Sequence, residues 1–276
     1  MRLQVLGSGG PEMGDQRAST SYLVWVDGKS RILIDCGAGS ALNFEKAGGN
    51  LEDLEAILLT HLHVDHSSDL PAYIKGAFFT DRATDLLVLG PGSGRWFPGT
   101  DEFVTRLFSA QGSIYPYLSD FLEGDRSYRI QPRSVAGGWA GSTESGIELE
   151  CATVVHGSTP ALAWRIGDGD SSITISGDFS DQSHRLSELA RETDILVCHN
   201  AVPEDATGLE RDLHAPPSFI GDVAAQAEPG RLVLSHRMKR TLGRESETLK
   251  EIKKRFTGPI DFAEDLETFA PLSVED

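Results

Sequence analysis

The sequence predicts an α/β fold in which two β-sheets pack against each other and helices cover the outside. Three observations lead to it. Short apolar runs bounded by Gly, Asp and Ser recur along the 276 residues, stretches with helical spacing separate many of them, and the strand-rich first half gives way to a mixture of strands and helices. The chain has no linker-like stretch and no fixed-period repeat, so residues 1–276 are expected to form a single domain.

The expected strands are short apolar runs of four to nine residues, and the expected helices carry apolar residues at three- and four-residue spacing. In chain order, the strands are expected at Leu3–Leu6, Tyr22–Val26, Arg31–Ile34, Ala56–Thr60, Leu86–Leu89, Ile147–Val155, Leu162–Ile166, Ser172–Ser176, Asp194–Cys198 and Arg231–Ser235. The helices are expected at Ser40–Ala47, Asp69–Phe79, Asp101–Phe108, Asp181–Arg191, Pro217–Gln226 and Glu245–Phe256. Between Pro91 and Gly146 the pattern is least regular, and the aromatic residues there fit either a pocket wall or ordinary packing.

Composition excludes several classes of protein. A hydrophobic content of 39% and a charged content of 24% are those of a folded globular chain. The net charge of −17, from 25 Lys and Arg against 42 Asp and Glu, disfavours a nucleic-acid partner. No run approaches the roughly 18 apolar residues of a membrane span, and the N-terminus lacks the apolar core of a signal peptide. We therefore expect no membrane partner and a cytoplasmic location, or a periplasmic one if a leader was removed. The odd number of cysteines favours buried thiols over disulfides.

The strongest chemical signal is a cluster of three histidines and one aspartate, His61, His63, Asp65 and His66, directly after the expected strand Ala56–Thr60. Such a cluster would destabilise the fold through desolvation and mutual repulsion unless a cation compensated it. The alternative is a polar loop with incidental histidines. Because a zinc ion needs about four donors, further ligands must come from elsewhere in the chain.

Three later residues, His156, Asp178 and His236, each follow a predicted strand. Strand ends hold side chains rigidly, as preformed metal coordination requires. Taken singly, each could equally be an ordinary core or surface residue. Taken with the histidine cluster, they predict a complete set of metal ligands for a hydrolytic centre.

The motif His61-x-His63-x-Asp65-His66, followed by His156, Asp178 and His236, resembles that of the metallo-beta-lactamase superfamily. The continuation Ser67–Pro71 and the spacing resemble its ribonuclease Z branch. The resemblance spans nearly the whole chain and implies a four-layer αββα sandwich with two metal ions between the sheets. It also implies that His61, His63 and His156 hold one zinc, that Asp65, His66 and His236 hold the second, and that Asp178 bridges both.

Two zinc ions would lower the pKa of a shared water, so that a bridging hydroxide attacks an ester. Mn²⁺ or iron also suits nitrogen and oxygen donors. Asp65 and His214 are the expected catalytic residues, because His214 lies where ribonuclease Z carries a histidine that contacts the scissile group. Asp35 resembles a carboxylate that orients a ligand histidine, with a turn-capping acid as the alternative.

The chain departs from ribonuclease Z in two respects. His199-Asn200-Ala201-Val202 stands where those enzymes have His-Glu-Ala-Thr, and the basic arm that grips transfer RNA is missing. Short runs such as Tyr73–Gly76, Pro160–Arg165 and Leu234–Arg237 instead resemble zinc-dependent arylsulfatases. That resemblance implies a small-molecule sulfate ester as substrate, with Lys75, Arg237 and Asn200 as substrate-binding residues.

Several alternatives stay open at this point. The same centre could serve a phosphodiesterase or a ribonuclease Z-type endonuclease that processes the 3′ ends of tRNA. It could also serve a lactonase or thioesterase, or a metal-binding protein without catalysis. A homodimer is compatible with the sequence, although no patch identifies an interface.

Overall fold

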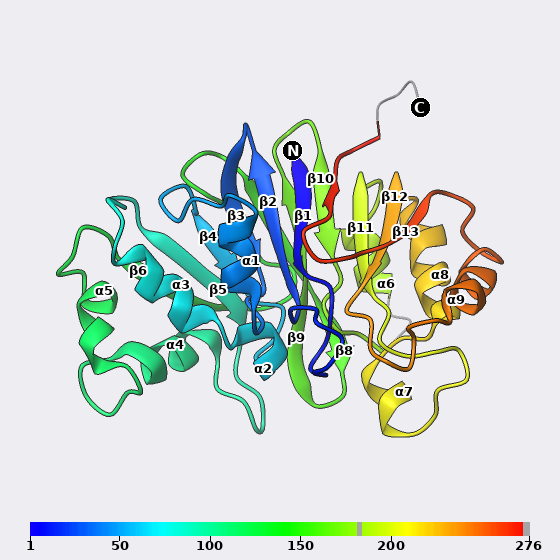
Figure 1. The fold of residues 1–276 in the computed structure, drawn as a ribbon, viewed down its shortest axis with the longest axis horizontal. Helices are drawn as coiled ribbons and strands as arrows, with labels where there is room; N and C mark the ends of the chain where they lie inside the picture. The colour runs from blue at the N-terminus through cyan, green and yellow to red at the C-terminus, as the bar shows by residue number, and fades with distance from the viewer. Residues whose placement is uncertain (181–183, 273–276) are drawn as a thin grey trace.

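The computed structural model describes residues 1–180 and 184–272. Its frame is a pair of seven-stranded sheets (Figure 1). In sheet order, the first contains β14 (Thr268–Phe269), β1 (Arg2–Gly7), β2 (Ser21–Val26), β3 (Lys29–Ile34), β4 (Ala56–Leu58), β5 (Leu86–Pro91) and β6 (Ile130–Val135). The second contains β13 (Ile260–Phe262), β12 (Arg231–Ser235), β11 (Ile195–His199), β10 (Ser172–Ile175), β9 (Thr159–Gly167), β8 (Glu148–His156) and β7 (Ala140–Ser142).

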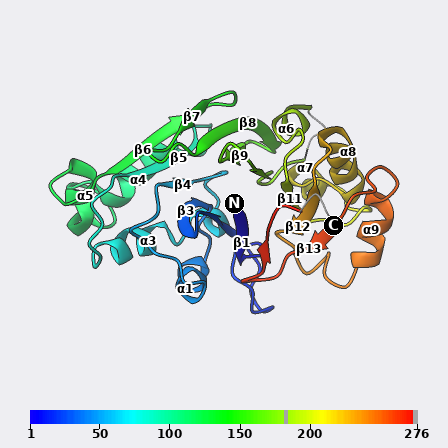
Figure 2. The same ribbon diagram turned by 90° about the horizontal axis from the view of Figure 1, so that it is seen from above.

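Helices cover the outer face of each sheet (Figure 2). The first sheet is covered by α1 (Ser40–Lys46), α3 (Leu70–Ala77), α4 (Thr100–Phe108) and α5 (Ser119–Glu123), and the second by α6 (His184–Leu189), α8 (Pro217–Ala227) and α9 (Glu245–Ile252). The short elements α2 (Val64–Ser67), η1 (Pro116–Leu118) and α7 (Leu209–Leu213) lie in connections. The structure thus confirms the α/β class and the four-layer αββα arrangement.

Three apolar clusters hold the four layers together. Side chains alternate between the two faces of a strand, so one set of each sheet points inward and the other points toward the helices. Val24 and Trp164, from different sheets, lie in the central cluster between the sheets. Leu33 packs with α3 and α4, whereas Leu232 packs with α8 and α9. The fold is stabilised by apolar burial on both faces of both sheets.

All ten expected strands and all six expected helices are present, although residues 181–183 of the helix expected at Asp181–Arg191 lie outside the described residues. Four short or polar strands, β6, β7, β13 and β14, were not predicted. β6 contains Pro132 and Arg133 and lies at a sheet edge, where half-exposed residues give no clear apolar run. The three cysteines are buried and free, as expected. None of the described helices has the length and apolar character needed to cross a membrane.

The carboxyl ends of the central strands of both sheets meet at one edge, the lower edge in Figure 1. Two hydrogen bonds tie the sheets together there. The Leu162 backbone N–H donates to the Thr60 carbonyl at 2.8 Å, and the Trp164 indole N–H donates to the Leu59 carbonyl at 3.0 Å. The residues that follow these strands are therefore held at a fixed separation across the sandwich.

Candidate metal centre

Seven histidines and two aspartates gather at this edge, from loops, strand ends and the short helix α2. They are His61 after β4, His63 at the N-terminus of α2, Asp65 and His66 within α2, His156 at the end of β8, Asp178 after β10, His199 at the end of β11, His214 after α7, and His236 after β12. All are buried except His63, which is partly exposed. So dense a group of ionisable side chains away from water requires compensation.

The Asp178 carboxylate lies at the centre of the group. Its oxygens are 3.6 Å from His156 Nε2, 3.6 Å from His236 Nε2, 3.8 Å from His66 Nε2 and 3.9 Å from His61 Nε2. Nδ1 of His214 lies 3.8 Å away. These separations are longer than hydrogen bonds. They fit nitrogen and oxygen atoms that face a common cation.

The donor atoms form two groups that share Asp178. One contains His61, His63, His156 and Asp178, and the other contains His66, Asp178, His199 and His236; in each group the donor atoms lie within 4.8 Å of one another. Asp65 borders the second group, with an oxygen 3.5 Å from His66 Nε2 and 3.9 Å from His236 Nε2. Nitrogen and oxygen donors grouped in this way are those that bind divalent metal ions.

Hydrogen bonds at the outer ring nitrogens orient the histidines. Nδ1 of His66 contacts the Asp35 carboxylate at 2.7 Å, Nδ1 of His156 contacts the Leu213 carbonyl at 2.8 Å, and Nδ1 of His236 contacts the Thr20 hydroxyl at 2.5 Å. Each contact leaves Nε2 facing inward, and Nε2 of His66 has no hydrogen-bond partner. Fixing one ring nitrogen while the other faces the site is the usual arrangement around a bound metal.

An unusual backbone conformation positions two residues of the centre. Asp35 and His236 have φ angles of 55° and 53°, in the left-handed region that costs most residues conformational energy. A Cβ at Gly37 would lie 2.1 Å from the Asp65 carbonyl oxygen, so only glycine lets this segment pack against α2. There the Cys36 N–H donates to the His66 carbonyl at 2.8 Å. The loop after β3 is therefore built to support the histidine cluster.

Burial shifts the pKa of several groups in the cluster. Burial lowers the pKa of His61 and His236 well below the ordinary value and lowers that of His214 to about 4. Burial opposes ionisation of Asp178, but attraction by the histidine rings, including the readily protonated His66, and a hydrogen bond from His199 hold its pKa well below normal. His66 differs: burial lowers its pKa, whereas the Asp35 and Asp65 carboxylates raise it, with a net result of about 9. Apart from His66, these are the protonation states that bind a metal.

The structure brings together the seven residues expected as metal ligands, and His214 with them. Lys75 lies on α3 with its ammonium over the rings of Phe78 and Phe79, at 4.1 and 4.8 Å. Arg237 is buried and paired with Glu245. Neither basic side chain joins the cluster. The side chain of Asn200, which directly follows β11, is buried, and its amide atoms have no hydrogen-bond partner.

His199 is the functional candidate that sequence reasoning did not include. Its Nδ1 lies 2.7 Å from Asp178 Oδ1, its Nε2 lies 3.0 Å from the Tyr22 hydroxyl, and its ring stacks on that of His236 with centroids 4.7 Å apart. Its position at the end of an expected strand, like that of the proposed ligands, was the signal available. Asp35 does contact His66, as its resemblance to an orienting carboxylate implied.

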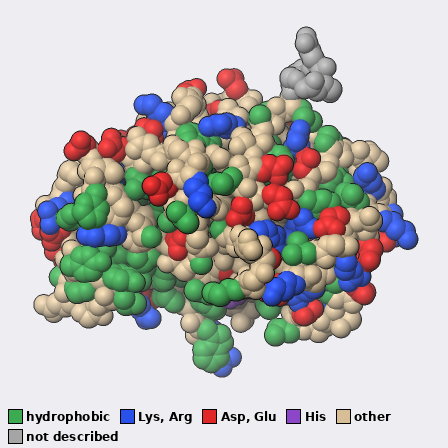
Figure 3. All heavy atoms as spheres, in the orientation of Figure 1, with side chains coloured by type: hydrophobic (Ala, Val, Ile, Leu, Met, Phe, Trp, Pro, Cys, Tyr) green, Lys and Arg blue, Asp and Glu red, His purple; other side chains and the backbone are tan. Residues whose placement is uncertain are grey.

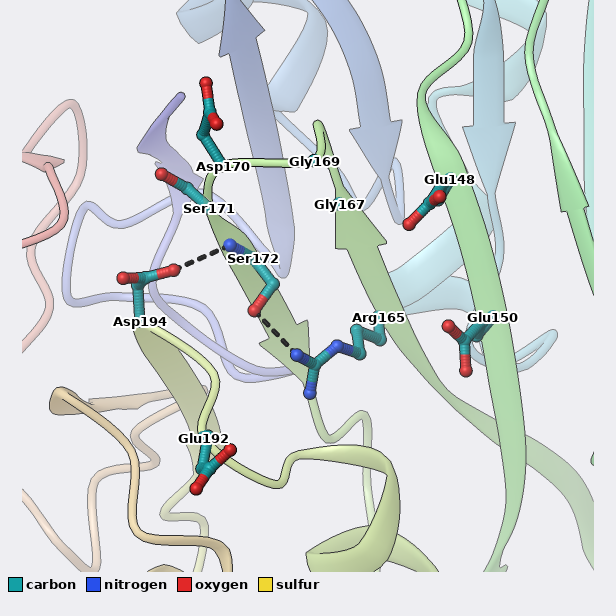
Figure 4. Close-up of a pocket in the computed structure, with 10 residues that line it drawn as sticks. All are labelled: Glu148, Glu150, Arg165, Gly167, Gly169, Asp170, Ser171, Ser172, Glu192 and Asp194. Carbon is teal, nitrogen blue, oxygen red and sulfur yellow. Dashed lines mark hydrogen bonds between the residues drawn. The ribbon is translucent and has the colours of Figure 1, made fainter.

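A hollow of about 380 Å³ lies at the opposite ends of β8, β9 and β10 (Figure 4). Its lining includes the carboxylates Glu148, Glu150 and Asp170 together with Arg165, and it contains no histidine. The Arg165 guanidinium donates to the Ser172 hydroxyl at 2.9 Å and to the Leu189 carbonyl at 2.9 Å. This hollow is separate from the metal centre.

Comparison with known proteins identifies the family. The model of the metallo-beta-lactamase superfamily matches residues 14–187, which is more than half of the chain. The chain belongs to the metallo-beta-lactamase superfamily. Ribonuclease Z from Mycobacterium sp. (strain KMS) is 29% identical over 280 residues, covering 96% of this chain and 94% of that protein. This relative supports the ribonuclease Z-like branch that the sequence motif indicated.

Solved structures of superfamily members share the fold. The metallo-beta-lactamase fold protein YhfI from Bacillus subtilis matches with a TM-score of 0.77 and 20% identity, covering 98% of this chain and 99% of that one. The short form of human tRNase Z matches with a TM-score of 0.72 and 18% identity, covering 99% of this chain and all of that one. Membership of this superfamily and the similarity to ribonuclease Z make the protein a metal-dependent hydrolase.

These relatives correct two expectations. The arylsulfatase prediction is wrong, because curated relatives of this chain, among them those from Mycobacterium sp. (strain KMS) and Mycobacterium bovis, are ribonucleases Z. The metal site could not discriminate the two branches, since sulfate and phosphate esters present nearly the same tetrahedral anion. The expectation of a small-molecule ester, with nucleic acid disfavoured, is wrong for the same reason. It rested on a whole-chain charge of −17, whereas charges beyond roughly 8 Å are screened at physiological salt.

Proposed function

We propose that this superfamily member is a ribonuclease Z-type endonuclease that cleaves a phosphodiester at the 3′ end of precursor tRNA. The observation that carries the proposal is the shared carboxylate of Asp178 between two groups of inward-facing donors. Similarity to ribonuclease Z over 96% of the chain supports RNA as the substrate. Because one apolar cluster joins both sheets, we propose that residues 1–276 act as one hydrolase domain.

Two zinc ions, or Mn²⁺ or iron in the same places, fit the donors. We assign His61, His63 and His156 to one ion, Asp65, His66 and His236 to the other, and Asp178 to both. Bound there, the ions would lower the pKa of a water molecule and stabilise charge on the phosphodiester oxygens. Both ring nitrogens of His199 are engaged, so we assign it to holding Asp178 in position. Asn200, whose buried amide lacks a partner, remains a proposed substrate-binding residue.

His214 is proposed to contact the leaving oxygen. It is the one histidine of the cluster whose Nδ1 is buried without a hydrogen-bond partner while lying 3.8 Å from Asp178. Burial lowers its pKa to about 4, so at neutral pH it is an uncharged imidazole that can donate one hydrogen bond. Such a hydrogen bond would stabilise negative charge on the leaving oxygen.

His214→Ala is expected to keep the bound metal but to lower kcat for precursor tRNA by about 100-fold, the lower range for losing a hydrogen-bond donor that stabilises a developing oxyanion. The loss should be largest for substrates with poor leaving groups, since these depend most on stabilisation of the leaving oxygen. Metal content by elemental analysis and kcat across a series of leaving groups would measure it. Equal rates for the variant and the parent across the series would remove His214 from the reaction.

The function itself is tested with zinc-loaded protein and a precursor tRNA that carries a 3′ trailer. We expect one cut at the trailer boundary and loss of cleavage when a chelator removes the metal. An aryl sulfate should not be cleaved. Hydrolysis of bis(p-nitrophenyl) phosphate without any cleavage of precursor tRNA would contradict the proposal. The protein would then be a phosphodiesterase, but precursor tRNA would not be its substrate.

A further inference from the structure

The loop between β5 and α4, residues 92–99, forms one wall of the metal centre. The Phe97 ring packs against that of His63 with centroids 5.5 Å apart. The loop is closed by a hydrogen bond from the Gly94 N–H to the Phe97 carbonyl at 3.0 Å. A Cβ at Gly94 would lie 2.6 Å from Pro160, so the loop rests directly on the β8–β9 turn that carries His156 and Thr159. The β5–α4 loop is therefore a fixed part of the site.

Two side chains of this loop project into solvent. Trp96 is 70% exposed, and its only ring contact among the described residues is the Arg95 guanidinium, 4.7 Å from the ring centroid. Figure 1 shows the loop projecting at the lower edge, and in Figure 3 hydrophobic and basic side chains protrude together at that place. Among the described residues, Arg95 has no carboxylate partner. An indole and a cation without a carboxylate partner thus stand together in the loop whose Phe97 packs against the proposed ligand His63.

Other exposed aromatic residues of this chain are differently placed. Phe79 is 75% exposed, but it packs on Phe78 with ring centroids 5.1 Å apart and lies under the Lys75 ammonium. That group lies on and after α3, away from the cluster of histidines. Trp96 is next in sequence to Phe97, so its backbone lies about 3.8 Å from that of a residue touching His63. Among the exposed aromatic residues in the described part of the chain, Trp96 is the one whose loop contacts a proposed metal ligand, through Phe97 and His63.

We propose that Trp96 and Arg95 bind an unpaired nucleotide of the RNA next to the scissile phosphate, the base stacking on the indole and the guanidinium contacting a phosphate. This deepens the proposed function and rests on it. Unpaired bases are the parts of an RNA that stack on aromatic side chains, and each stack contributes about 1–3 kcal/mol. A local cation would also offset the repulsion between RNA and a chain of net charge −17. The loop would then provide RNA contacts in place of the basic arm that the sequence lacks.

Trp96→Ala is expected to raise KM for precursor tRNA about tenfold, which corresponds to 1.4 kcal/mol of lost stacking. Trp96→Phe should restore most of the affinity, since a ring remains. Arg95→Ala should reduce the slope of log KM against log salt concentration by about one, because one contact to a phosphate is lost. Phe79→Ala is the matched control, because it removes an equally exposed ring and should leave KM unchanged. Metal content and melting temperature of each variant would establish that the centre is intact.

An abasic substrate makes the test specific to stacking. Removing the base of the nucleotide next to the cut should raise KM of the parent enzyme by the same factor as Trp96→Ala does. Because both changes remove the same stacking contact, the two together should raise KM no more than either alone. If the parent cleaves precursor tRNA but Trp96→Ala behaves like Phe79→Ala, the loop proposal is overturned and the proposed function stands. If the parent does not cleave precursor tRNA, both are overturned.

Discussion

Replacing Asp178 by alanine is expected to abolish stoichiometric metal binding and to lower hydrolysis by a factor of at least about 1000, because the protein would lose the one carboxylate shared by both donor groups. The side chain lies within 4 Å of ring nitrogens of six histidines. Asp178→Asn should behave similarly, since a neutral amide is a poor metal ligand. Elemental analysis of the purified variant and cleavage of precursor tRNA would measure the two effects.

Asp170→Ala provides the control for Asp178→Ala. Asp170 is an exposed carboxylate in the hollow at the opposite end of the second sheet, so its loss should change neither metal content nor turnover. An Asp178→Ala protein with normal metal content and normal turnover would show that this carboxylate does not bridge the two sites.

Asp35→Asn is expected to weaken metal binding by about 10- to 100-fold while the protein stays folded, as is typical when a carboxylate behind a ligand histidine is removed. The Asp35 carboxylate accepts hydrogen bonds from the Thr60 N–H at 2.7 Å and from the Thr60 hydroxyl at 2.8 Å, and it holds His66 Nδ1 at 2.7 Å. An asparagine would turn an N–H group toward one of these donors, so the ring of His66 would lose its fixed orientation. Titration of the metal-free protein with Zn²⁺ would measure the affinity.

Asp27→Asn is a matched control for that experiment. Asp27 also has a positive φ, 52°, but it lies in the exposed turn between β2 and β3. Asparagine tolerates such a φ about as well as aspartate, so both substitutions are neutral for the backbone. If Asp35→Asn bound zinc as tightly as Asp27→Asn, Asp35 would have no part in orienting His66.

Much of the fold could be predicted from the sequence because the central strands are buried on both faces. A continuous run such as Ile195–Cys198 is apolar at every position, and the structure places it in the middle of the second sheet. Edge elements could not be predicted in the same way. β7, Ala140–Ser142, is exposed along its length and exists because its backbone pairs with β8. Its sequence therefore carries no apolar signal.

The types of residue in the site could also be predicted from the sequence, but which neighbouring residues belong to the site could not. His61 to His66 form a local motif, and the later ligands each follow an apolar run. His199 has the same setting, but only the meeting of β10 and β11 reveals that its ring lies 2.7 Å from Asp178. Lys75 and Arg237 are near the ligands in sequence, yet the fold turns them toward Phe78 and Glu245.

The sequence by itself determined the α/β class, the metal-binding chemistry and the superfamily, because these depend on apolar runs and on the types and order of a few donor residues. Only the tertiary structure decided which donors share a carboxylate, which ring nitrogens face inward, and that Trp96 stands exposed next to Phe97, whose ring packs on His63. Those features depend on how separate loops meet at one edge of two packed sheets. The distances between these loops are set by packing between residues far apart in the sequence, so a local sequence pattern cannot predict them.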